Sequence, residues 1–487
     1  MRETGRISAN ELNRACSRDD GAVSRLLTEE IGKSQGKIVV LDDDPTGVQT
    51  VHGVSVYTDW SRESVLRGFE EENRLFYILT NSRGFTVEET RRAHREIAGN
   101  IAWAARMTGR EFVIVSRSDS TLRGHYPLET EVLRQTLEEE EHWHVDGEVI
   151  CPFFLEGGRF TLDNVHYVRC GGELVPAGQT EFAADRTFGY RSSDLRDYVE
   201  EKTGGAYPAE SVSCIPLEYL RSGAVDQITG ILLAVKDFGK VVVNAVDYGD
   251  LRVFCLALYR AMAQGRSFMF RTAASFVKVF GGIKDRPLLA GSELLDGRTG
   301  RGGVIVVGSH TEKTTRQLAE LQKVPGITFL EFNSDLVLDP EAFREEIGRT
   351  VREMERRVAA GQTVAVFTRR TLLEIPGDTP EAALLRSVKI SDAVQSLVAS
   401  LKTAPAYVVA KGGITSSDVG VKALQVKRAD VLGQIRPGVP VWRTGPESRF
   451  PGIPYVIFPG NVGEDGTLRE AVEILLAAGN GGESRDL

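Results

Sequence analysis

The sequence repeats one pattern that strongly limits the fold: a short apolar run, rich in β-branched residues, ends abruptly at polar residues and glycine. The runs and the polar segments that follow them are 38–41 with 42–47, 74–79 with 80–84, and 111–115 with 116–125. Each run is shorter than a typical helix and is typical of a buried strand. Helix-like stretches such as 87–106 lie between them. Strand, polar loop and helix in alternation predict an α/β fold with a parallel sheet.

Polar loops that follow parallel strands meet at one edge of the sheet, where open α/β folds bind their ligands. The first loop begins with three consecutive carboxylates, Asp42, Asp43 and Asp44. Adjacent carboxylates repel one another, so a fold gains little from them unless a ligand or nearby arginines offset the repulsion. A solvated acidic turn is the alternative for this loop alone. Because three such loops are expected at one edge, we predict a ligand site there.

The side chains of these loops indicate which ligand they suit. Arginines bind a carboxylate or phosphate through forked hydrogen bonds, and the candidates are Arg83, Arg117 and Arg123. Aspartates accept hydrogen bonds from hydroxyl groups or remove a proton from one, and the candidates are Asp43, Asp44 and Asp119. Together they predict a small hydroxy acid as the ligand. A surface ion pair is the alternative for each arginine.

Composition excludes several classes of protein. The chain has 487 residues, enough for two or three domains, with 41% hydrophobic and 26% charged residues. Its net charge is −9 and it has no basic stripe, which argues against a nucleic-acid partner. No apolar run reaches the ~18–20 residues that span a bilayer, and none resembles a signal core. The five cysteines are scattered, so we expect reduced thiols in a cytoplasmic protein.

The pattern changes along the chain in a way that predicts two domains. Residues 1–35 are expected to form a helical N-terminal extension, and 36–290 a first α/β domain. A glycine-rich linker is expected at 291–303, followed by a second α/β domain at 304–487. Each domain is expected to be a mostly parallel sheet flanked by helices.

Glycine-rich loops follow the strands expected in the second domain. Glycine lets backbone N–H groups approach an anion, and hydroxyl groups add donors, so these loops suit phosphate. The candidate nucleotide-binding residues are Ser309, Gly412, Gly413, Ile414, Thr415, Gly460, Asn461 and Gly463. An ordinary strand–helix turn with a capping residue is the alternative. Neither GxxxxGK[ST] nor GxGxxG at a strand–helix turn is present, so a nucleotide would need a less common cradle.

These motifs together resemble the four-carbon acid sugar kinase family, and the likeness runs from Asp43 to Gly463. The matching segments are Asp43-Asp44-Pro45-Thr46-Gly47, Ser82-Arg83, Asp119-Ser120-Thr121-Leu122-Arg123-Gly124, Gly308-Ser309, Gly412-Gly413-Ile414-Thr415-Ser416, Pro437-Gly438-Val439-Pro440 and Gly460-Asn461-Val462-Gly463. The chain departs from the family at Arg117, where lysine is usual, at Asp42 and Pro45, and at Phe458-Pro459. These departures bear more on the substrate than on the reaction.

The resemblance implies an N-terminal domain that binds a sugar acid and a C-terminal domain that binds ATP, with phosphoryl transfer in the cleft between them. It adds Ser82 and Ser120 to the expected substrate-binding residues. Mg²⁺ is expected to arrive with ATP, held mainly by the phosphates and by few protein ligands. Asp119 is the first candidate for the base that orients the attacking hydroxyl, because its neighbours can keep it ionised, and Asp43 is the second. A helix N-cap is the alternative for Asp119.

Three functions compete at this point. The first is an ATP-dependent kinase for a tetronate such as threonate, erythronate or an oxo-tetronate. The second is a non-catalytic sensor of sugar acid and nucleotide, which has less use for a potential base. The third is a nicotinamide-dependent oxidoreductase, against which the missing GxGxxG argues. ADP release from a panel of sugar acids would separate them. The sequence leaves the stereochemistry of the acid and the oligomeric state open, a homodimer included.

Overall fold

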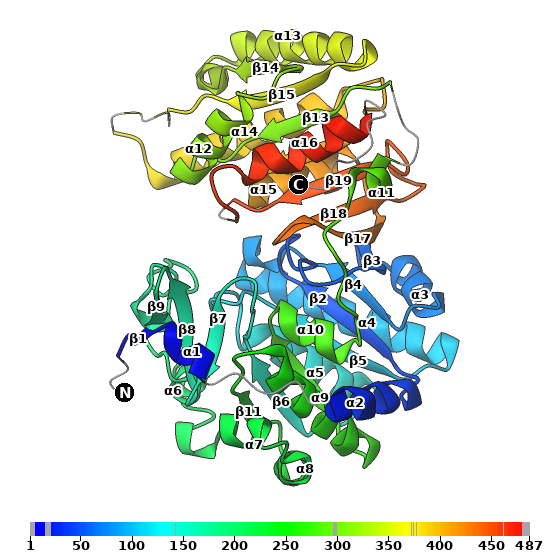
Figure 1. The fold of residues 1–487 in the computed structure, drawn as a ribbon, viewed down its shortest axis with the longest axis vertical. Coiled ribbons are helices and arrows are strands. Elements are labelled where there is room, and N and C mark those ends of the chain that lie inside the picture. The colour runs from blue at the N-terminus through cyan, green and yellow to red at the C-terminus, as the bar shows by residue number, and fades with distance from the viewer. Residues whose placement is uncertain are drawn as a thin grey trace. The chain divides into compact units, whose positions relative to one another are not determined.

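The protein divides into two compact units. The computed structural model describes residues 5–14, 21–141, 143–295, 300–371, 373, 375, 377–460 and 462–479. Unit 1 comprises Met1–Val51 and Asp59–Asp285, and unit 2 comprises His52–Thr58 and Arg286–Leu487. Figure 1 shows helices packed around a sheet in each unit. The predicted class, α/β with a parallel sheet and two domains, is confirmed.

The units differ from the expected boundaries at two places. Strand β3 (Val54–Tyr57), expected in the first domain, pairs antiparallel with β17 (Arg428–Arg436) and so belongs to unit 2. Residues 286–290, expected in the first domain, and the expected linker 291–303 also belong to unit 2, where α11 (Gly291–Leu295) packs on α16 (Thr467–Gly479).

The sheet of unit 1 has the strand order β10-β11-β6-β12-β5-β2-β4, and every neighbouring pair is parallel. Its strands are β2 (Lys37–Asp42), β4 (Leu75–Leu79), β5 (Phe112–Arg117), β6 (Gly147–Cys151), β10 (Ser213–Ile215), β11 (Gly239–Val243) and β12 (Phe268–Thr272). Strands β2, β4, β6 and β12 are buried along their whole length, as continuous apolar runs require when helices cover both faces.

The helices of unit 1 pack in two groups. One consists of α3 (Arg62–Glu70), α4 (Val87–Thr108) and α5 (Leu128–Glu141), and the other of α2 (Gly21–Lys33), α7 (Leu217–Arg221), α8 (Val225–Ala234), α9 (Tyr248–Ala263) and α10 (Ala274–Phe280). Thr86 and Glu89 form a capping box that begins α4, and Gly109 in the left-handed region ends it. Within the described residues of the chain, no helix is long and apolar enough to cross a membrane.

A small antiparallel sheet adds to unit 1 in the order β1-β9-β8-β7. Its strands are β1 (Ile7–Ser8), β7 (Arg159–Leu162), β8 (Val165–Cys170) and β9 (Glu173–Pro176), and α6 (Leu195–Lys202) follows it along the chain. The N-terminal extension therefore contains the short strand β1 in addition to the helices α1 (Asn10–Arg14) and α2. Tyr190, Leu195 and Tyr198 share a buried cluster with Leu122 and Tyr126, which lie beyond β5.

The sheet of unit 2 has the order β3-β17-β18-β19-β16-β13-β15-β14. The pairs from β3 to β19 are antiparallel and those from β19 to β14 are parallel. Its further strands are β13 (Val304–Val307), β14 (Ile327–Phe332), β15 (Thr363–Thr368), β16 (Val408–Lys411), β18 (Val439–Thr444) and β19 (Pro454–Phe458). Its further helices are α12 (Glu312–Leu321), α13 (Pro340–Ala359), α14 (Pro380–Ala399) and α15 (Gly413–Asp418).

Candidate functional site

A buried ion pair joins the ends of two neighbouring strands of unit 1. Asp42 ends β2 and Arg117 ends β5, and the two residues are partners in the parallel register. Arg117 Nη1 lies 2.9 Å from Asp42 Oδ1, and both residues are almost fully buried. A Cβ atom on Gly47 would lie 2.0 Å from Asp42 Oδ2, so the turn after β2 needs glycine to fold back over this pair. The pair thus forms the buried base of the polar cluster at the carboxyl ends of β2 and β5.

Arg83 connects the carboxylates of two loops. It lies in the 3-10 turn η1 (Ser82–Gly84), after β4. Its Nη2 is 2.5 Å from Asp44 Oδ2, its Nε is 3.3 Å from Asp43 Oδ2, and its Nη1 is 4.0 Å from Asp119 Oδ1. The arginine therefore offsets the mutual repulsion of these carboxylates, as the sequence required.

Asp119 lies at the centre of the loop that follows β5. Its backbone N–H donates to Asp43 Oδ2 at 3.3 Å, which ties the two loops together. Its Oδ2 accepts from the Thr121 hydroxyl and, at 2.7 Å, from Arg123 Nε. Thr121 and Arg123 were expected to help orient Asp119, and both contact its side chain. The predicted site residues Asp43, Asp44, Arg83, Asp119 and Arg123 are thus brought together.

Four side chains hold four successive backbone carbonyls of this loop. His166 donates from Nε2 to Ser120 O at 2.8 Å, Tyr190 donates to Thr121 O at 2.7 Å, Tyr198 donates to Leu122 O at 3.0 Å, and Arg271 Nη2 donates to Arg123 O at 2.9 Å. All four side chains belong to buried residues. We call them the carbonyl clamp.

The clamp comes from distant parts of unit 1. His166 lies on β8, Tyr198 on α6 and Arg271 on β12, whereas Tyr190 lies in the segment before α6. Burial lowers the pKa of His166 to about 4, so its ring is neutral and carries its proton on Nε2, the nitrogen that faces a carbonyl. The clamp fixes a backbone that includes Leu122 in the left-handed region, at φ 69°.

A second buried layer supports the arginine turn. Ser82 donates its hydroxyl to Glu129 Oε1 at 2.6 Å, and Arg271 Nη1 lies 2.7 Å from Glu129 Oε2. Ser82 is fully buried, and in the structure its hydroxyl contacts Glu129. The expected contact between Ser82 and the substrate stays a prediction. Sequence reasoning missed Arg271 and Glu129. An arginine near the end of the apolar run Phe268–Thr272 is the signal that could have found the first, as it found Arg117.

The four aspartates differ in their electrostatic environment. Burial raises the pKa of Asp42 to about 7 and that of Asp43 to about 6, against the opposing effect of arginines. Burial would also raise the pKa of Asp44 and Asp119. For Asp44, Arg83 and the Thr46 hydrogen bonds outweigh burial and lower the pKa. For Asp119, Arg83 and Arg123 hold the pKa well below its usual range.

The same aspartates differ in their hydrogen bonds. Within the described part of the chain, Asp43 Oδ1 is a buried oxygen without a hydrogen-bond partner. Asp119 Oδ2, in contrast, accepts two hydrogen bonds. Asp43 therefore combines a raised pKa with an unused acceptor, whereas Asp119 is a permanently ionised partner of arginines.

In unit 2, the glycine-rich loops line a pocket of about 360 Å³. Gly412 has a φ of 122°, and a Cβ atom there would lie 3.1 Å from Ser309 Cβ. A Cβ atom on Gly308 would lie 2.4 Å from Thr415 Oγ1. The loops after β13 and β16 thus approach each other so closely that both positions need glycine.

The pocket contains most of the predicted nucleotide-binding residues. Ser309, Gly412, Gly413, Ile414 and Thr415 line it, together with Gly308, His310, Ser334, Thr368, Thr371, Leu373, Ala383, Arg386, Ser387, Ile390, Ser391 and Val394. Gly460 and Gly463 are not among the described residues that line it, and Asn461 lies outside the described part of the chain. The pocket therefore combines glycines and hydroxyl groups with both apolar and polar residues of α14.

Lys411 connects the loop after β16 to the loop after β19. It is fully buried, and its Nζ donates to Pro459 O at 2.5 Å and to Gly460 O at 3.1 Å. Burial lowers its pKa to about 7. Gly460 thus lies next to the end of β16, which directly precedes Gly412, although Gly460 is not among the described residues that line the pocket.

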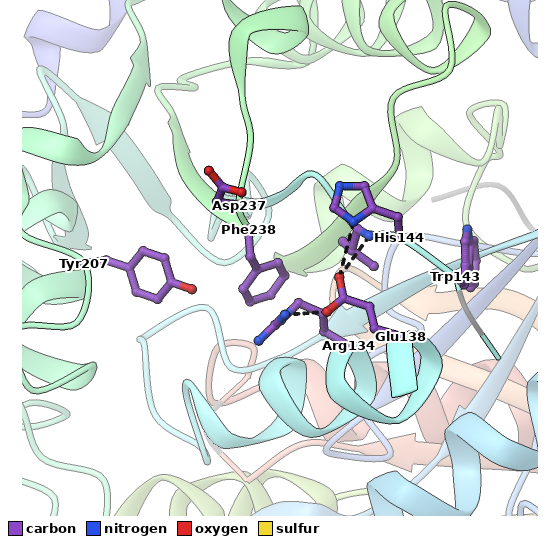
Figure 2. Close-up of a pocket in the computed structure, with 8 residues that line it drawn as sticks. Arg134, Glu138, Trp143, His144, Tyr207, Asp237 and Phe238 are labelled. Carbon is purple, nitrogen blue, oxygen red and sulfur yellow. Dashed lines mark hydrogen bonds and ion pairs between the residues drawn. The ribbon is translucent and has the colours of Figure 1, made fainter. Parts of the chain in front are cut away.

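Figure 2 shows another pocket, of about 610 Å³, in unit 1. It lies beside the start of β11, where Asp237 and Phe238 precede the strand, and is also lined by Arg134, Glu138, Trp143, His144, Val145 and Tyr207. Arg134 donates to Glu138 at 2.5 Å and lies over the Phe238 ring at 4.7 Å. Glu138 also lies 3.8 Å from His144 Nδ1. Its arginine is thus neutralised within the pocket wall.

Comparison with known families matches both units. Residues 38–280 match the family described as the sugar-binding N-terminal domain, and residues 304–468 match the nucleotide-binding C-terminal domain. The first range contains the aspartate–arginine cluster, and the second contains the glycine-lined pocket.

Individual relatives agree with these matches. D-erythronate kinase of Heliobacterium modesticaldum is 26% identical over 341 residues, which cover 68% of this chain and 70% of that protein. A solved structure from Salmonella typhimurium LT2 has a TM-score of 0.63 at 16% identity, and covers 89% of this chain and 98% of that one. One from Haemophilus influenzae has a TM-score of 0.60 at 17% identity, covering 90% and 100%. The two structures support the fold.

Proposed function

Since this chain belongs to the four-carbon acid sugar kinase family, with its sugar-binding N-terminal and nucleotide-binding C-terminal domains, we propose that it is an ATP-dependent kinase of a small sugar acid. The substrate class is a tetronate such as erythronate, threonate or an oxo-tetronate, which the D-erythronate kinase relative supports. The observation that carries the proposal is the pairing of two chemistries: an arginine–aspartate cluster in unit 1 and a glycine-lined pocket in unit 2.

The pocket of unit 2 fits a nucleotide. Gly308 and Gly412 let the loops after β13 and β16 approach each other closely, which brings glycine-rich backbone from both loops to one pocket, as a phosphate site needs. Ser309 and Thr415 add hydroxyl donors, and Ile390 and Val394 offer an apolar surface for a base. Bound ATP would supply the phosphoryl group, with Mg²⁺ held mainly by its phosphates. No catalytic step is assigned to a protein metal ligand.

The cluster of unit 1 fits a hydroxy acid. Arg83 and Arg123 are the proposed partners of the carboxylate, and Asp44 is a proposed acceptor for hydroxyl groups. Arg83 contacts three carboxylates in the structure, so an incoming anion would compete with aspartates for it. Arg117 is committed to Asp42, which gives it a supporting role beneath the site. Ser120 stays a candidate substrate-binding residue, because it lies in the loop that the carbonyl clamp holds.

We assign the role of base to Asp43 in preference to Asp119, which the sequence favoured. A base must accept a proton, and the pKa of Asp43 is raised to about 6 by burial, whereas Arg83 and Arg123 outweigh burial at Asp119 and lower its pKa. Asp43 Oδ1 also has no hydrogen-bond partner among the described residues. Arg83 Nε lies 3.3 Å from Asp43 Oδ2, so a turn of Arg83 toward the substrate carboxylate would free this oxygen.

The decisive experiment measures ADP release from ATP in the presence of Mg²⁺, with and without each acid of a panel of tetronates. The proposal expects ADP formation that depends on at least one acid and a phosphorylated acid as product. Binding of both ligands without ADP formation would favour a sensor. Acid-dependent reduction of a nicotinamide cofactor would favour an oxidoreductase.

A further inference from the structure

Arg159 is a half-buried cation whose guanidinium group is only partly hydrogen-bonded by the described residues. It is the first residue of β7, in the small sheet. Its Nη1 donates to Gly157 O, and its Nε is buried without a hydrogen-bond partner among the described residues. Burying a guanidinium N–H donor without an acceptor is costly. Burial lowers the pKa of Arg159, and the charge of Arg123 adds to the effect against the opposing charge of Asp119.

Arg159 and Arg123 share one aromatic neighbour. The guanidinium carbon of Arg123 lies 5.1 Å from the centre of the Phe182 ring, and that of Arg159 lies 5.7 Å from the same centre. Two cations held around one ring repel each other unless an anion lies close to both. Arg123 takes Asp119 as its near partner at 2.7 Å, and Asp185 is 4.0 Å away. No carboxylate of the described residues lies within ion-pair distance of Arg159.

We propose that Arg159 joins Arg83 and Arg123 in holding the carboxylate of the acid substrate, with Phe182 as the wall that the guanidinium groups of Arg159 and Arg123 lie against. This inference rests on the proposed function and adds the small sheet to the acid site as an element of substrate recognition. An anion there would accept hydrogen bonds from Arg159 and separate the positive charges of Arg159 and Arg123. Asp119 then serves to orient Arg123, which agrees with its ionised state.

Arg159→Gln tests this assignment by removing the charge while keeping polarity and most of the length. We expect D-erythronate binding, measured by calorimetry without nucleotide, to weaken ~10- to 100-fold, as loss of a charged hydrogen bond does. We expect KM for the acid to rise by a similar factor and kcat at saturating acid to change less than about threefold. A residue needed only for folding would not produce this split.

The matched control is Arg169→Gln. Arg169 lies on β8 of the same small sheet, is exposed, and packs over the Phe160 ring at 5.1 Å. We expect this variant to bind D-erythronate as the wild type does. Arg159→Lys keeps the charge but loses the planar fork, so we expect it to bind at least ~5-fold more weakly than the wild type.

Three results are decisive. If the Arg159→Gln protein binds the acid as tightly as the wild type, the inference about Arg159 is wrong. The proposed function is then unaffected, provided that the wild-type protein phosphorylates the acid. If Arg159→Gln fails to fold, wild-type affinity in Arg159→Lys overturns the inference in the same way. A wild-type protein that neither binds nor phosphorylates any tetronate overturns the proposed function and this inference with it.

Discussion

Replacing Asp43 by asparagine separates the two candidate bases through the pH dependence of turnover. A base works only when ionised, and burial raises the pKa of Asp43 to about 6. With that pKa, about 90% of Asp43 is ionised at pH 7 and about 10% at pH 5, so kcat/KM should fall about tenfold as the pH falls between them. Arg83 and Arg123 lower the pKa of Asp119 despite its burial, so a base at that position would lose no activity over this range.

The assay is ADP release at saturating ATP and Mg²⁺ from pH 5 to pH 8 for the wild type, Asp43→Asn and Asp119→Asn. The Asp43→Asn protein should lose ~10²- to 10⁴-fold in kcat, and its residual rate should be flat through pH 6. The Asp119→Asn protein should keep the loss of rate at low pH. It should show mainly a raised KM for the sugar acid, because Arg83 and Arg123 lose a partner. Ionisation of the nucleotide affects all three proteins alike, so the comparison isolates the protein group.

The reasoning is refuted if the kcat of Asp43→Asn lies within a few-fold of the wild-type value, or if the rate of this variant still falls as the pH drops through 6. If Asp119→Asn alone then lost the predicted factor in kcat, Asp119 would be the base that the sequence first suggested.

Other substitutions test other parts of the account. Gly413→Val should fold normally, because nothing lies within 4 Å of its Cβ position, but should weaken ATP binding with acid binding intact; unchanged ATP affinity by calorimetry would remove the assignment. Tyr198→Phe and Tyr190→Phe should each lower unfolding free energy by about 1 kcal/mol and raise KM for the acid, as denaturant titration and kinetics would show. Burial raises the pKa of Asp42 to about 7, so its contribution to stability is present at low pH and lost as the pH rises through 7. Asp42→Asn should flatten that dependence in urea unfolding, and an unaltered slope would contradict it.

Local sequence alone determined the fold class and much of both sites. Short β-branched runs can bury both faces only as strands of a covered parallel sheet, so the alternation of runs and polar loops was enough to predict α/β domains. The same argument predicted that Asp43, Arg83 and Asp119 meet, because the carboxyl ends of neighbouring parallel strands share an edge. It also brought Ser309 and Gly412 together at the pocket of unit 2.

Only the tertiary structure showed which distant segments support these loops. Strand β3 pairs in unit 2, although it lies between strands of unit 1 in the sequence, because pairing with β17 depends on residues far along the chain. The carbonyl clamp uses His166, Tyr190 and Tyr198, whose residue types are ordinary for a core. Nothing in their local sequence says that they face carbonyls.

The ranking of the two aspartates also depended on tertiary structure. Asp43 and Asp119 both follow a strand and both lie in a family motif, so their sequence contexts are alike. Their pKa values diverge because burial dominates at Asp43, whereas Arg83 and Arg123 outweigh it at Asp119. Arg159 is a similar case, since its Nε lacks a hydrogen-bond partner among the described residues only because the fold buries that atom. Residue type sets what a group can do, but desolvation and distant charges set its protonation state, and those are properties of the folded chain.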